Sequence, residues 1–427
     1  MIDRVLLANA HRSRHRIVNA YSTDDLLAIL TQAAALWADA TYETRRRTAE
    51  ALYSVVPLAP VMLDHGLDLI FQAVTDETMR NLTDRQTLGM PSPGALRSGH
   101  ADGSEAFVGP NIIYHSLAGN VPGLSIPAVV CGVLARSVTI VRDSRRQPLL
   151  TGAFVDTIAD IDPLVAAMIL PVRPDVSADD ARAALAEQDC TVELHGSDAV
   201  VAELSDAFSG IPTVQHGSRI SAVIADGNAQ PGDWAQRIAH DIAMYEGLGC
   251  LTPHTVFVED RGDIDAWSSA LAEGLSAYER SWPRRRQAVA LEADRRAFLE
   301  RAEVSSLLEN ASLALGGSDD AWCIVTSAET APSTGPGMRC ITVTSTADRE
   351  HTVRAIRTMP YPIAGLGLTL DWADDTAAAP SHIDALKAAT GATLVCPAGR
   401  MQAPPLAWEQ DGGRRLGDLL DWRPAPS

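Results

Sequence analysis

The stretch AGNVPGLSIPAVVCGVLARSVTIVRDSRRQPLL, residues 118–150, passes from a glycine-rich loop into an apolar helix and then into a strand that ends in basic residues. Within it, residues 124–135 have the composition of a buried helix, and residues 138–142 form a β-branched run typical of a buried strand. This order of elements predicts an α/β fold, because parallel strands need a helical crossover between them.

The same alternation continues toward the C-terminus of this region. The expected elements are a helix at 148–158, a strand at 166–172, a helix through 186 capped by Ser177, a strand at 190–194, and a helix ending near 208 capped by Ser197. Strands separated by helices of this length predict a doubly wound parallel sheet.

A second α/β set begins at Ile220. It has expected strands at 220–225 and 254–260 around a helix at about 233–247, and then charged helices to about Leu313. Four later β-rich runs begin at Cys323, Cys340, Leu366 and Ala392, with a helix expected at 348–358. The second set therefore predicts a second α/β domain.

The N-terminal part has a helical pattern instead. Leucines and alanines recur every three or four residues from Thr23, the expected N-cap, to about Val56, and the first hundred residues are predicted to be mainly helical. Residues 88–109 are rich in Gly, Ser and Pro, which is typical of a connection.

The composition limits the classes of function. A chain of 427 residues with 46% hydrophobic content can form two or three domains. Its net charge of -19 argues against binding to nucleic acid or to anionic membranes. No apolar run is long enough for a membrane span or a signal peptide, so a cytoplasmic protein is expected. The six cysteines form no C-x-x-C pair, which argues against a disulfide framework and a zinc site.

One cysteine has the surroundings of a nucleophile. Cys250 lies in YEGLGCLTPHTVFVED, residues 245–260, on a glycine-rich turn between a helix and a strand. A thiol on such a turn lies close to backbone N–H groups that favour the thiolate and can hold an oxyanion. Cys131, Cys323, Cys340 and Cys396 lie in apolar runs, where a role in the core is the simpler interpretation.

Two further segments suggest ligand binding. The loop of residues 115–124 offers the side-chain amide of Asn120 as a donor to an oxyanion, although a Gly-Asn-Val-Pro sequence is more often only a turn. The strand ending at Arg142 delivers cations to a strand end, where doubly wound sheets bind phosphates. A solvated basic turn is the alternative interpretation there.

Together these segments resemble the aldehyde dehydrogenase superfamily and, more closely, its LuxC-type acyl-CoA reductase branch. The resemblance covers the chain from about Asn111 to the C-terminus. HGSDAVVAEL, from His195, is similar to the superfamily's helix opening beside the cofactor, and GLGCLTPHTVFVE is similar to its nucleophile segment. The ending GATLVCPAGRMQAPPLAWEQDGGRRLGDLLDW resembles the closing signature of the branch.

The resemblance implies an aldehyde-dehydrogenase-like fold with three parts. These are an NADP-binding domain at 1–216 with a mainly helical part at about 1–90, a catalytic thiol domain at 217–400, and a C-terminal return segment at 401–427. It also implies that Cys250 attacks an acyl thioester while Asn120 and the Cys250 N–H hold the oxyanion, and that NADPH reduces the thioacyl carbon to an aldehyde.

The implied cofactor contacts are spread over two loops. Arg142 and Ser144 are expected at the adenosine end of NADPH, and Gly196 and Ser197 at its pyrophosphate. Arg145 stands where NAD-using relatives often have Glu, which favours the 2′-phosphate of NADPH. No metal is required by this chemistry.

The chain departs from the family patterns at two positions. In VQHGSR, residues 214–219, Gln215 stands where hydrolytic relatives carry the glutamate that activates water, so the thioacyl enzyme is expected to be protected from hydrolysis. Leu248 stands where the LuxC-type pattern usually has Gln, two residues before the nucleophile.

Several questions stay open at the level of sequence. The donor is an acyl-CoA or an acyl-carrier thioester, an acyl-activating protein is a candidate partner, and a homo-oligomer is expected from the resemblance alone. Alternative functions are a CoA-acylating aldehyde dehydrogenase that works oxidatively and a non-catalytic acyl-binding subunit. His115, His195, His216 and His254 flank the motifs, and local hydrogen bonding is the simpler role for each.

Overall fold

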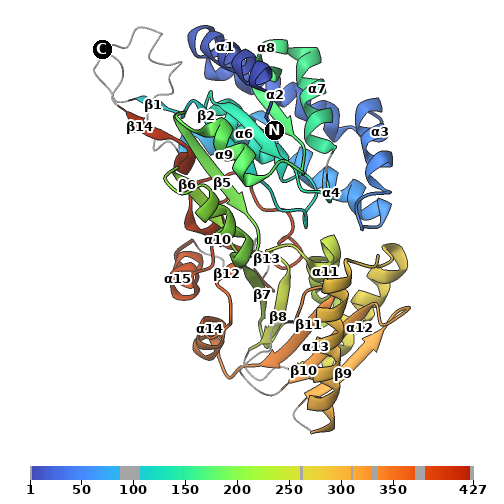
Figure 1. Ribbon diagram of the computed structural model, residues 1–427. Coiled ribbons are helices and arrows are strands. Elements are labelled where there is room, and N and C mark those ends of the chain that lie inside the picture. Colours follow the sequence, from blue (N-terminus) through green and yellow to red (C-terminus); the bar gives the residue numbers. More distant parts are fainter. Residues whose placement is uncertain are drawn as a thin grey trace. The chain divides into compact units, whose positions relative to one another are not determined.

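Two sheets built mainly from parallel strands organise the chain (Figure 1). The computed structural model describes residues 2–86, 106–147, 149–259, 263–308, 311–327, 335–370 and 380–423. The chain divides into two compact units. The first contains Met1–Val56, Leu63–Gly217 and Pro405–Ser427, and the second contains Pro57–Met62 and Ser218–Pro404.

The first unit holds a five-stranded parallel sheet. Its order is β4 (Ile169–Val172), β3 (Val138–Arg142), β2 (Ile112–Ser116), β5 (Cys190–His195) and β6 (Thr213–His216). The crossovers contain α6 (Ser125–Leu134), α7 (Leu150–Ile161), α8 (Pro163–Ala166), α9 (Ala178–Leu185) and α10 (Asp198–Ala207). The predicted alternation and the Ser177 and Ser197 caps are confirmed. Because the chain leaves β2 toward β3 and later returns to β2's other side with β5, the switch point at which such sheets bind ligands lies at β2 and β5.

The two faces of this sheet carry different side chains, because successive residues of a strand point to opposite sides. Tyr114 and Leu194 belong to one buried apolar cluster, which also includes residues of α1 and α9. The intervening positions place His115 of β2 opposite Glu193 of β5 on the other face. The second face therefore buries polar groups that need partners.

Helices dominate the N-terminal part of the first unit, as predicted. They are α1 (Arg4–Ala20), α2 (Thr23–Ala38), α3 (Glu43–Leu52), α4 (Pro60–Gln72) and α5 (Asp76–Gln86). The N-cap of α2 is Ser22, which forms a capping box with Asp25, so the prediction of Thr23 was wrong by one residue. Most of the Gly/Ser/Pro-rich segment lies outside the described residues. Near its end, β1 (Ala106–Val108) pairs with β14 (Asp421–Arg423).

The second unit holds a seven-stranded sheet. In its described part, one edge strand is antiparallel to its neighbour and the other strands are parallel to one another. The order is β13 (Leu394–Pro397), β12 (Ile363–Leu368), β7 (Ile220–Ala225), β8 (Pro253–Val258), β11 (Cys340–Ser345), β10 (Trp322–Ser327) and β9 (Ala311–Gly316). Its helices are α11 (Pro231–Ala243), α12 (Ile264–Ser281), α13 (Val289–Leu307), α14 (Arg349–Arg357) and α15 (Pro380–Thr390). The prediction that helix continues to Leu313 was wrong, because β9 begins at Ala311.

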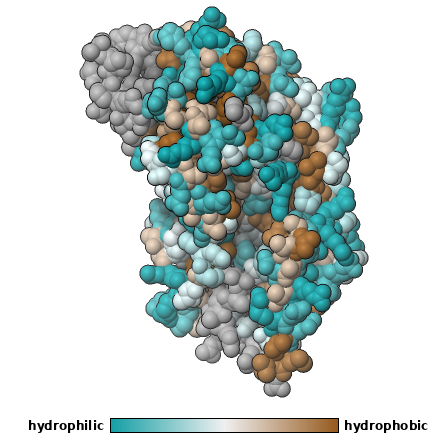
Figure 2. Space-filling model, viewed as in Figure 1, coloured by the Kyte–Doolittle hydropathy of each residue, from teal (hydrophilic) through white to brown (hydrophobic). Residues whose placement is uncertain are grey.

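Apolar clusters cover both faces of the second sheet. One cluster joins Val256 and Ile341 to Trp267 of α12, and another joins Ile224 and Leu366 to helices on the other side. Figure 2 shows mainly hydrophilic residues on the described surface that faces the viewer. None of the described helices is both long and apolar enough to cross a membrane.

Candidate active site

Cys250 lies in the second unit, between the end of α11 and the start of β8. Its thiol forms no disulfide and is partly buried. The hydroxyl of Ser221 on β7 donates to the Cys250 carbonyl at 2.9 Å, and Ser221 in turn accepts the Gly365 N–H at 3.0 Å. The backbone of Cys250 is therefore linked by hydrogen bonds to two neighbouring strands.

The turn before Cys250 has an unusual backbone. Tyr245, Glu246 and Gly247 all adopt positive φ, at 54°, 57° and 68°. A Cβ at Gly247 would lie 2.9 Å from the Met338 nitrogen and 3.0 Å from the Arg339 nitrogen, so only glycine fits there. Left-handed conformation at non-glycine residues persists only where the surroundings enforce it.

A buried ion pair supplies that enforcement. Glu246 is fully buried and lies 3.0 Å from the guanidinium of Arg339, which also pairs with Glu279. Glu246 accepts the Arg285 N–H at 3.0 Å as well. Burial raises the pKa of Glu246 to about 7, although the Arg339 charge opposes the shift. Sequence reasoning missed this pair, because its members lie 93 residues apart.

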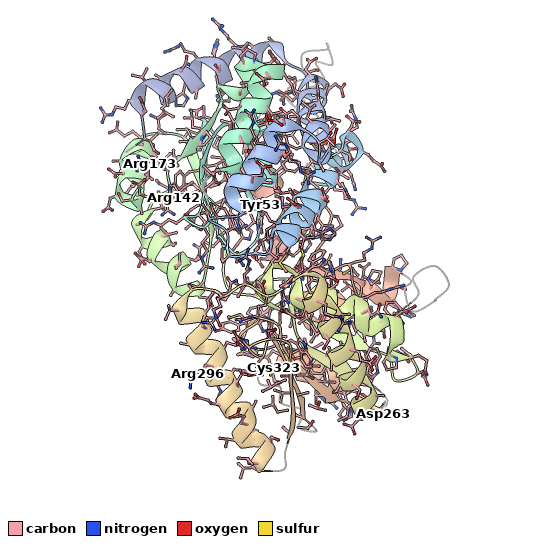
Figure 3. All side chains as sticks on the ribbon, turned by 90° about the vertical axis from the view of Figure 1, so that its right-hand side faces the viewer. Tyr53, Arg142, Arg173, Asp263, Arg296 and Cys323 are labelled. Carbon is pink, nitrogen blue, oxygen red and sulfur yellow. The ribbon has the colours of Figure 1, made fainter. Side chains whose placement is uncertain are left out.

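The other cysteines have different surroundings. Burial raises the pKa of Cys131 to about 12 and that of Cys190 to about 11, which disfavours the thiolate in both. Cys323 and Cys340 are buried in adjacent strands, and Cys323 lies inside the sheet in Figure 3. Cys396 is partly buried, and burial raises the pKa of its thiol.

Asn120 lies in the first unit on a loop that a single side chain holds at both ends. The amide of Gln147 donates to the Gly119 carbonyl at 3.3 Å and accepts the Gly123 N–H at 3.3 Å. Asn120, between these two contacts, is partly buried. Gln147 was not singled out from the sequence, although it lies in the segment that decides the fold.

The predicted cofactor residues at the end of β3 differ in their hydrogen bonds and in their exposure. Arg142, labelled in Figure 3, donates to the Ser116 hydroxyl at 3.2 Å and to the carbonyls of Pro174 and Val176 at 3.1 Å each. Three of its five N–H groups therefore form hydrogen bonds within the protein. Ser144 is partly buried beside Gly119, whereas Arg145 is exposed.

Gly196 and Ser197 lie between β5 and α10. Gly196 donates its N–H to the His216 carbonyl at 3.1 Å, and the Ser197 hydroxyl accepts the Val200 N–H at 3.4 Å as the N-cap of α10. Ser197 and the first turn of the helix are exposed. Exposed N–H groups at a helix N-terminus suit an anion.

Gln215 and His216 occupy opposite faces at the end of β6. The Gln215 side chain is exposed and donates to the hydroxyls of Ser205 on α10 and of Thr213, at 3.0 and 3.2 Å. His216 instead turns to the face that carries Glu193.

Glu193 is the centre of a group of charges on that second face. Its carboxylate contacts the rings of His115, His195 and His216. Burial would raise the pKa of Glu193, but the three histidines outweigh it and hold the pKa well below its usual range. Burial likewise would lower the pKa of His216, but Asp411 and Glu193 raise it to about 9. The expected local hydrogen bond is present at His254, which lies 2.7 Å from the Gly335 carbonyl.

Comparison with known proteins gives the family. A model described as acyl-CoA reductase (LuxC) matches residues 18–422. The chain belongs to the LuxC family. The match includes α2 to α5, which precede the part of the chain that the sequence resemblance covers.

The chain is also similar to known relatives in sequence and to solved structures in fold. The LuxC family member is 27% identical over 180 residues to a long-chain acyl-protein thioester reductase from Vibrio harveyi, and 25% identical over 175 residues to one from Photorhabdus laumondii. These matches cover 40% of this chain and 37% and 36% of those relatives. A putative aldehyde dehydrogenase from Burkholderia cenocepacia has a TM-score of 0.73 at 14% identity, covering 97% of this chain and 88% of that one.

A succinic semialdehyde dehydrogenase from Streptococcus pyogenes, solved with NADP+, has a TM-score of 0.70 at 14% identity over 98% of this chain and 93% of that one. The fold of this LuxC family member is therefore aldehyde-dehydrogenase-like, as expected from the sequence. Of the predicted site residues, Cys250 belongs to the second unit and the other six belong to the first.

Proposed function

We propose that this protein reduces acyl thioesters to aldehydes with NADPH, through a thioacyl intermediate on Cys250. The observation that carries the proposal is the setting of Cys250, a partly buried cysteine on a fixed turn, in a chain of the LuxC family. The buried thiols of Cys131 and Cys190 have raised pKa values and are poor nucleophiles by comparison.

The first step is acyl transfer to Cys250. The thiolate attacks the carbonyl carbon of the thioester, the carbon–sulfur bond to the donor breaks, and the donor leaves as a thiol after taking up a proton. The Cys250 backbone N–H and the side-chain amide of Asn120 are the proposed donors to the oxyanion. The Gln147 clamp supports this role, because an oxyanion donor must be fixed before the reaction begins.

The residues of the first unit fit a phosphorylated dinucleotide in part. The exposed first turn of α10, which Ser197 caps, offers N–H groups to a pyrophosphate beside Gly196, and exposed Arg145 offers a cation to a 2′-phosphate. Ser144, which lies beside Gly119, is the proposed contact to the adenosine end, whereas Arg142 would act mainly by ordering the loop at Pro174 and Val176. When bound, NADPH supplies the hydride that reduces the thioacyl carbon.

The remaining steps depend on the protein's own groups. A thiohemiacetal on Cys250 collapses to the aldehyde and frees the thiolate for another turnover. Hydrolysis of the thioacyl enzyme competes with reduction, and the amide of Gln215 cannot take a proton from water as a carboxylate can. The substitution therefore favours reduction over release of the acid.

The test follows NADPH consumption by the purified 427-residue chain with short, long and aromatic acyl groups, presented both as CoA esters and on a carrier protein, with the aldehyde identified as product. Cys250→Ala should abolish turnover, whereas Cys396→Ala, at another partly buried thiol, should retain it. Faster oxidation of aldehydes with CoA and NADP+ would indicate the oxidative function instead. A stable acyl adduct on Cys250 without turnover would indicate an acyl-binding subunit.

A further inference from the structure

The face of the first sheet that carries Glu193 brings together side chains from three strands and from the C-terminal segment. His115 lies next to the last residue of β2, Glu193 and His195 lie near the end of β5, and His216 ends β6. The strand register sets His115 beside Glu193 and His195 beside His216. Asp411 reaches the same place from a segment 195 residues away from His216.

Three ligand atoms in this group converge on one point. Glu193 Oε1 lies 3.5 Å from His195 Nε2 and 3.2 Å from His216 Nε2. The three residues present ligand atoms that all lie within 4.8 Å of one another. Zn²⁺ holds nitrogen and oxygen ligands at about 2.0–2.2 Å in a tetrahedron, which separates them by roughly 3.3–3.6 Å. The two observed separations from Glu193 are close to this range.

The outer atoms of the same side chains are held as in a metal centre. His216 Nδ1 lies 2.8 Å from Asp411 Oδ2, which fixes the ring with Nε2 directed at Glu193. His115 Nδ1 lies 2.5 Å from Glu193 Oε2, which leaves Oε1 directed at the other two histidines. A carboxylate on the far nitrogen of a ligating histidine is the usual way in which proteins orient such ligands.

Burial and space also suit an ion. The side chains of His115, Glu193, His216 and Asp411 are at most 9% exposed, and that of His195 is 12% exposed. The rings of His195 and His216 stack at 4.4 Å, so both Nε2 edges face the same carboxylate. A cavity of about 10 Å³ adjoins Glu193 and His216, close to the room that a single water needs.

We propose that Glu193, His195 and His216 bind one divalent transition-metal ion, with Zn²⁺ preferred, while Asp411 and His115 orient the ligands. Two imidazoles and one carboxylate match the ligand preference of Zn²⁺ rather than that of Mg²⁺ or Ca²⁺, which take oxygen ligands. Three protein ligands leave a coordination position for water.

This site is separate from the proposed reduction, since neither thioester attack nor hydride transfer needs a metal. The spacing of the cysteines could not indicate this metal site, because none of its ligands is a cysteine. The ion would tie the ends of β5 and β6 to the C-terminal segment through His216 and Asp411. Binding to the folded state alone would also raise stability.

The experiment uses the 427-residue chain with Cys250→Ala, freed of metal with a chelator and then titrated with Zn²⁺ by calorimetry. One ion per chain should bind, Mg²⁺ and Ca²⁺ should not compete, and the Co²⁺-substituted protein should lack thiolate-to-metal absorption. His195→Gln, which changes the most exposed ligand, should weaken Zn²⁺ binding at least tenfold. Asp411→Asn should weaken it by about 10- to 100-fold.

His15→Gln on the exposed face of α1 is the matched control and should bind Zn²⁺ as the parent does. Circular dichroism and the melting temperature of each chelator-treated variant show whether it is folded. Absence of Zn²⁺ binding in the parent, or equal affinity in parent and folded His195→Gln, would overturn the proposal and leave an ion-pair network at Glu193. Thiolate absorption in the Co²⁺ protein would also overturn it, by placing the ion at a cysteine.

Discussion

Replacing Arg339 with Met tests whether a buried charge holds the turn before Cys250. In the native protein the Arg339 guanidinium pairs with Glu246 and Glu279 and donates to the Trp282 carbonyl at 2.9 Å. The side chains of Arg339 and Glu246 are 1% and 0% exposed. Methionine fills much of the same space without charge, so the Glu246 carboxylate would lose its cation and could not reach water.

The size of the loss should depend on pH. Removing one partner of a buried pair costs about 3–5 kcal/mol. Glu246 can limit this cost by taking up a proton, since its native pKa is about 7 and loss of Arg339 would raise that pKa further. Between the pKa of Glu246 in the unfolded chain and pH 7, the folded parent holds this proton and the unfolded chain does not. The contribution of this proton to the free energy of unfolding therefore falls as pH rises through that range, and it is constant above it. In the variant the fall continues above pH 7, at up to about 1.4 kcal/mol per pH unit.

The assay is urea denaturation of parent and Arg339→Met at pH 6 and pH 8.5, with hydrogen exchange of peptides covering residues 244–250 to locate the change. The stability difference should be larger at pH 8.5. Glu246→Gln/Arg339→Met should lose less and show no added pH dependence, and Arg286→Met, which breaks an exposed pair with Asp319, should cost at most about 1 kcal/mol. A difference that is equal at both pH values, or smaller at pH 8.5, would refute the assignment of the uncompensated charge to Glu246.

Four substitutions test the proposed chemistry. Cys250→Ala should remove both acyl-enzyme formation, seen by intact mass, and aldehyde production, while the circular dichroism spectrum stays that of the parent. Asn120→Ala should slow single-turnover acylation by roughly 10²- to 10³-fold with little change in substrate affinity; a pure binding defect would argue against an oxyanion role. Gln147→Ala should slow the same step on the order of tenfold by releasing the Asn120 loop. Gln215→Glu should release free acid from acyl-CoA in the absence of NADPH, and an unchanged hydrolysis rate in a variant that still acylates would mean that Gln215 does not face the thioester.

The fold was predictable where local pattern and tertiary environment agree. The strands at 138–142 and 220–225 match β3 and β7 because apolar β-branched runs are buried on both faces of a parallel sheet. β9 was missed because it is an edge strand with exposed positions, and its leucines pair with β10 through contacts that no local pattern records. The α2 cap was displaced by one residue because Ser22 and Thr23 are both good N-caps, and the Asp25 side chain selects Ser22.

The site was predictable only as segments. Glycine-rich spacing identified the turn of Cys250 and the loop of Asn120, because close backbone approach demands small residues there. The groups that fix these segments were not predictable. Glu246 finds Arg339 across 93 residues, and Gln147 finds both ends of its loop only after β3 has folded beside β2. Arg142 differs from these cases. Its place at a strand end suggested a phosphate ligand, but three of its N–H groups form hydrogen bonds within the protein.

The end of β6 shows why adjacent residues in one motif can serve separate purposes. Alternation along the strand turns Gln215 toward Ser205 on α10 and His216 toward Glu193, so the two side chains respond to different neighbours. Gln215 is exposed and contacts two hydroxyls, so a glutamate in its place would be ionised at neutral pH. Such a carboxylate could accept a proton from water without the raised pKa that burial gives to a base. Hydrolysis by Gln215→Glu and Zn²⁺ binding by His195→Gln therefore probe opposite faces of one sheet, and either proposal can fail while the other stands.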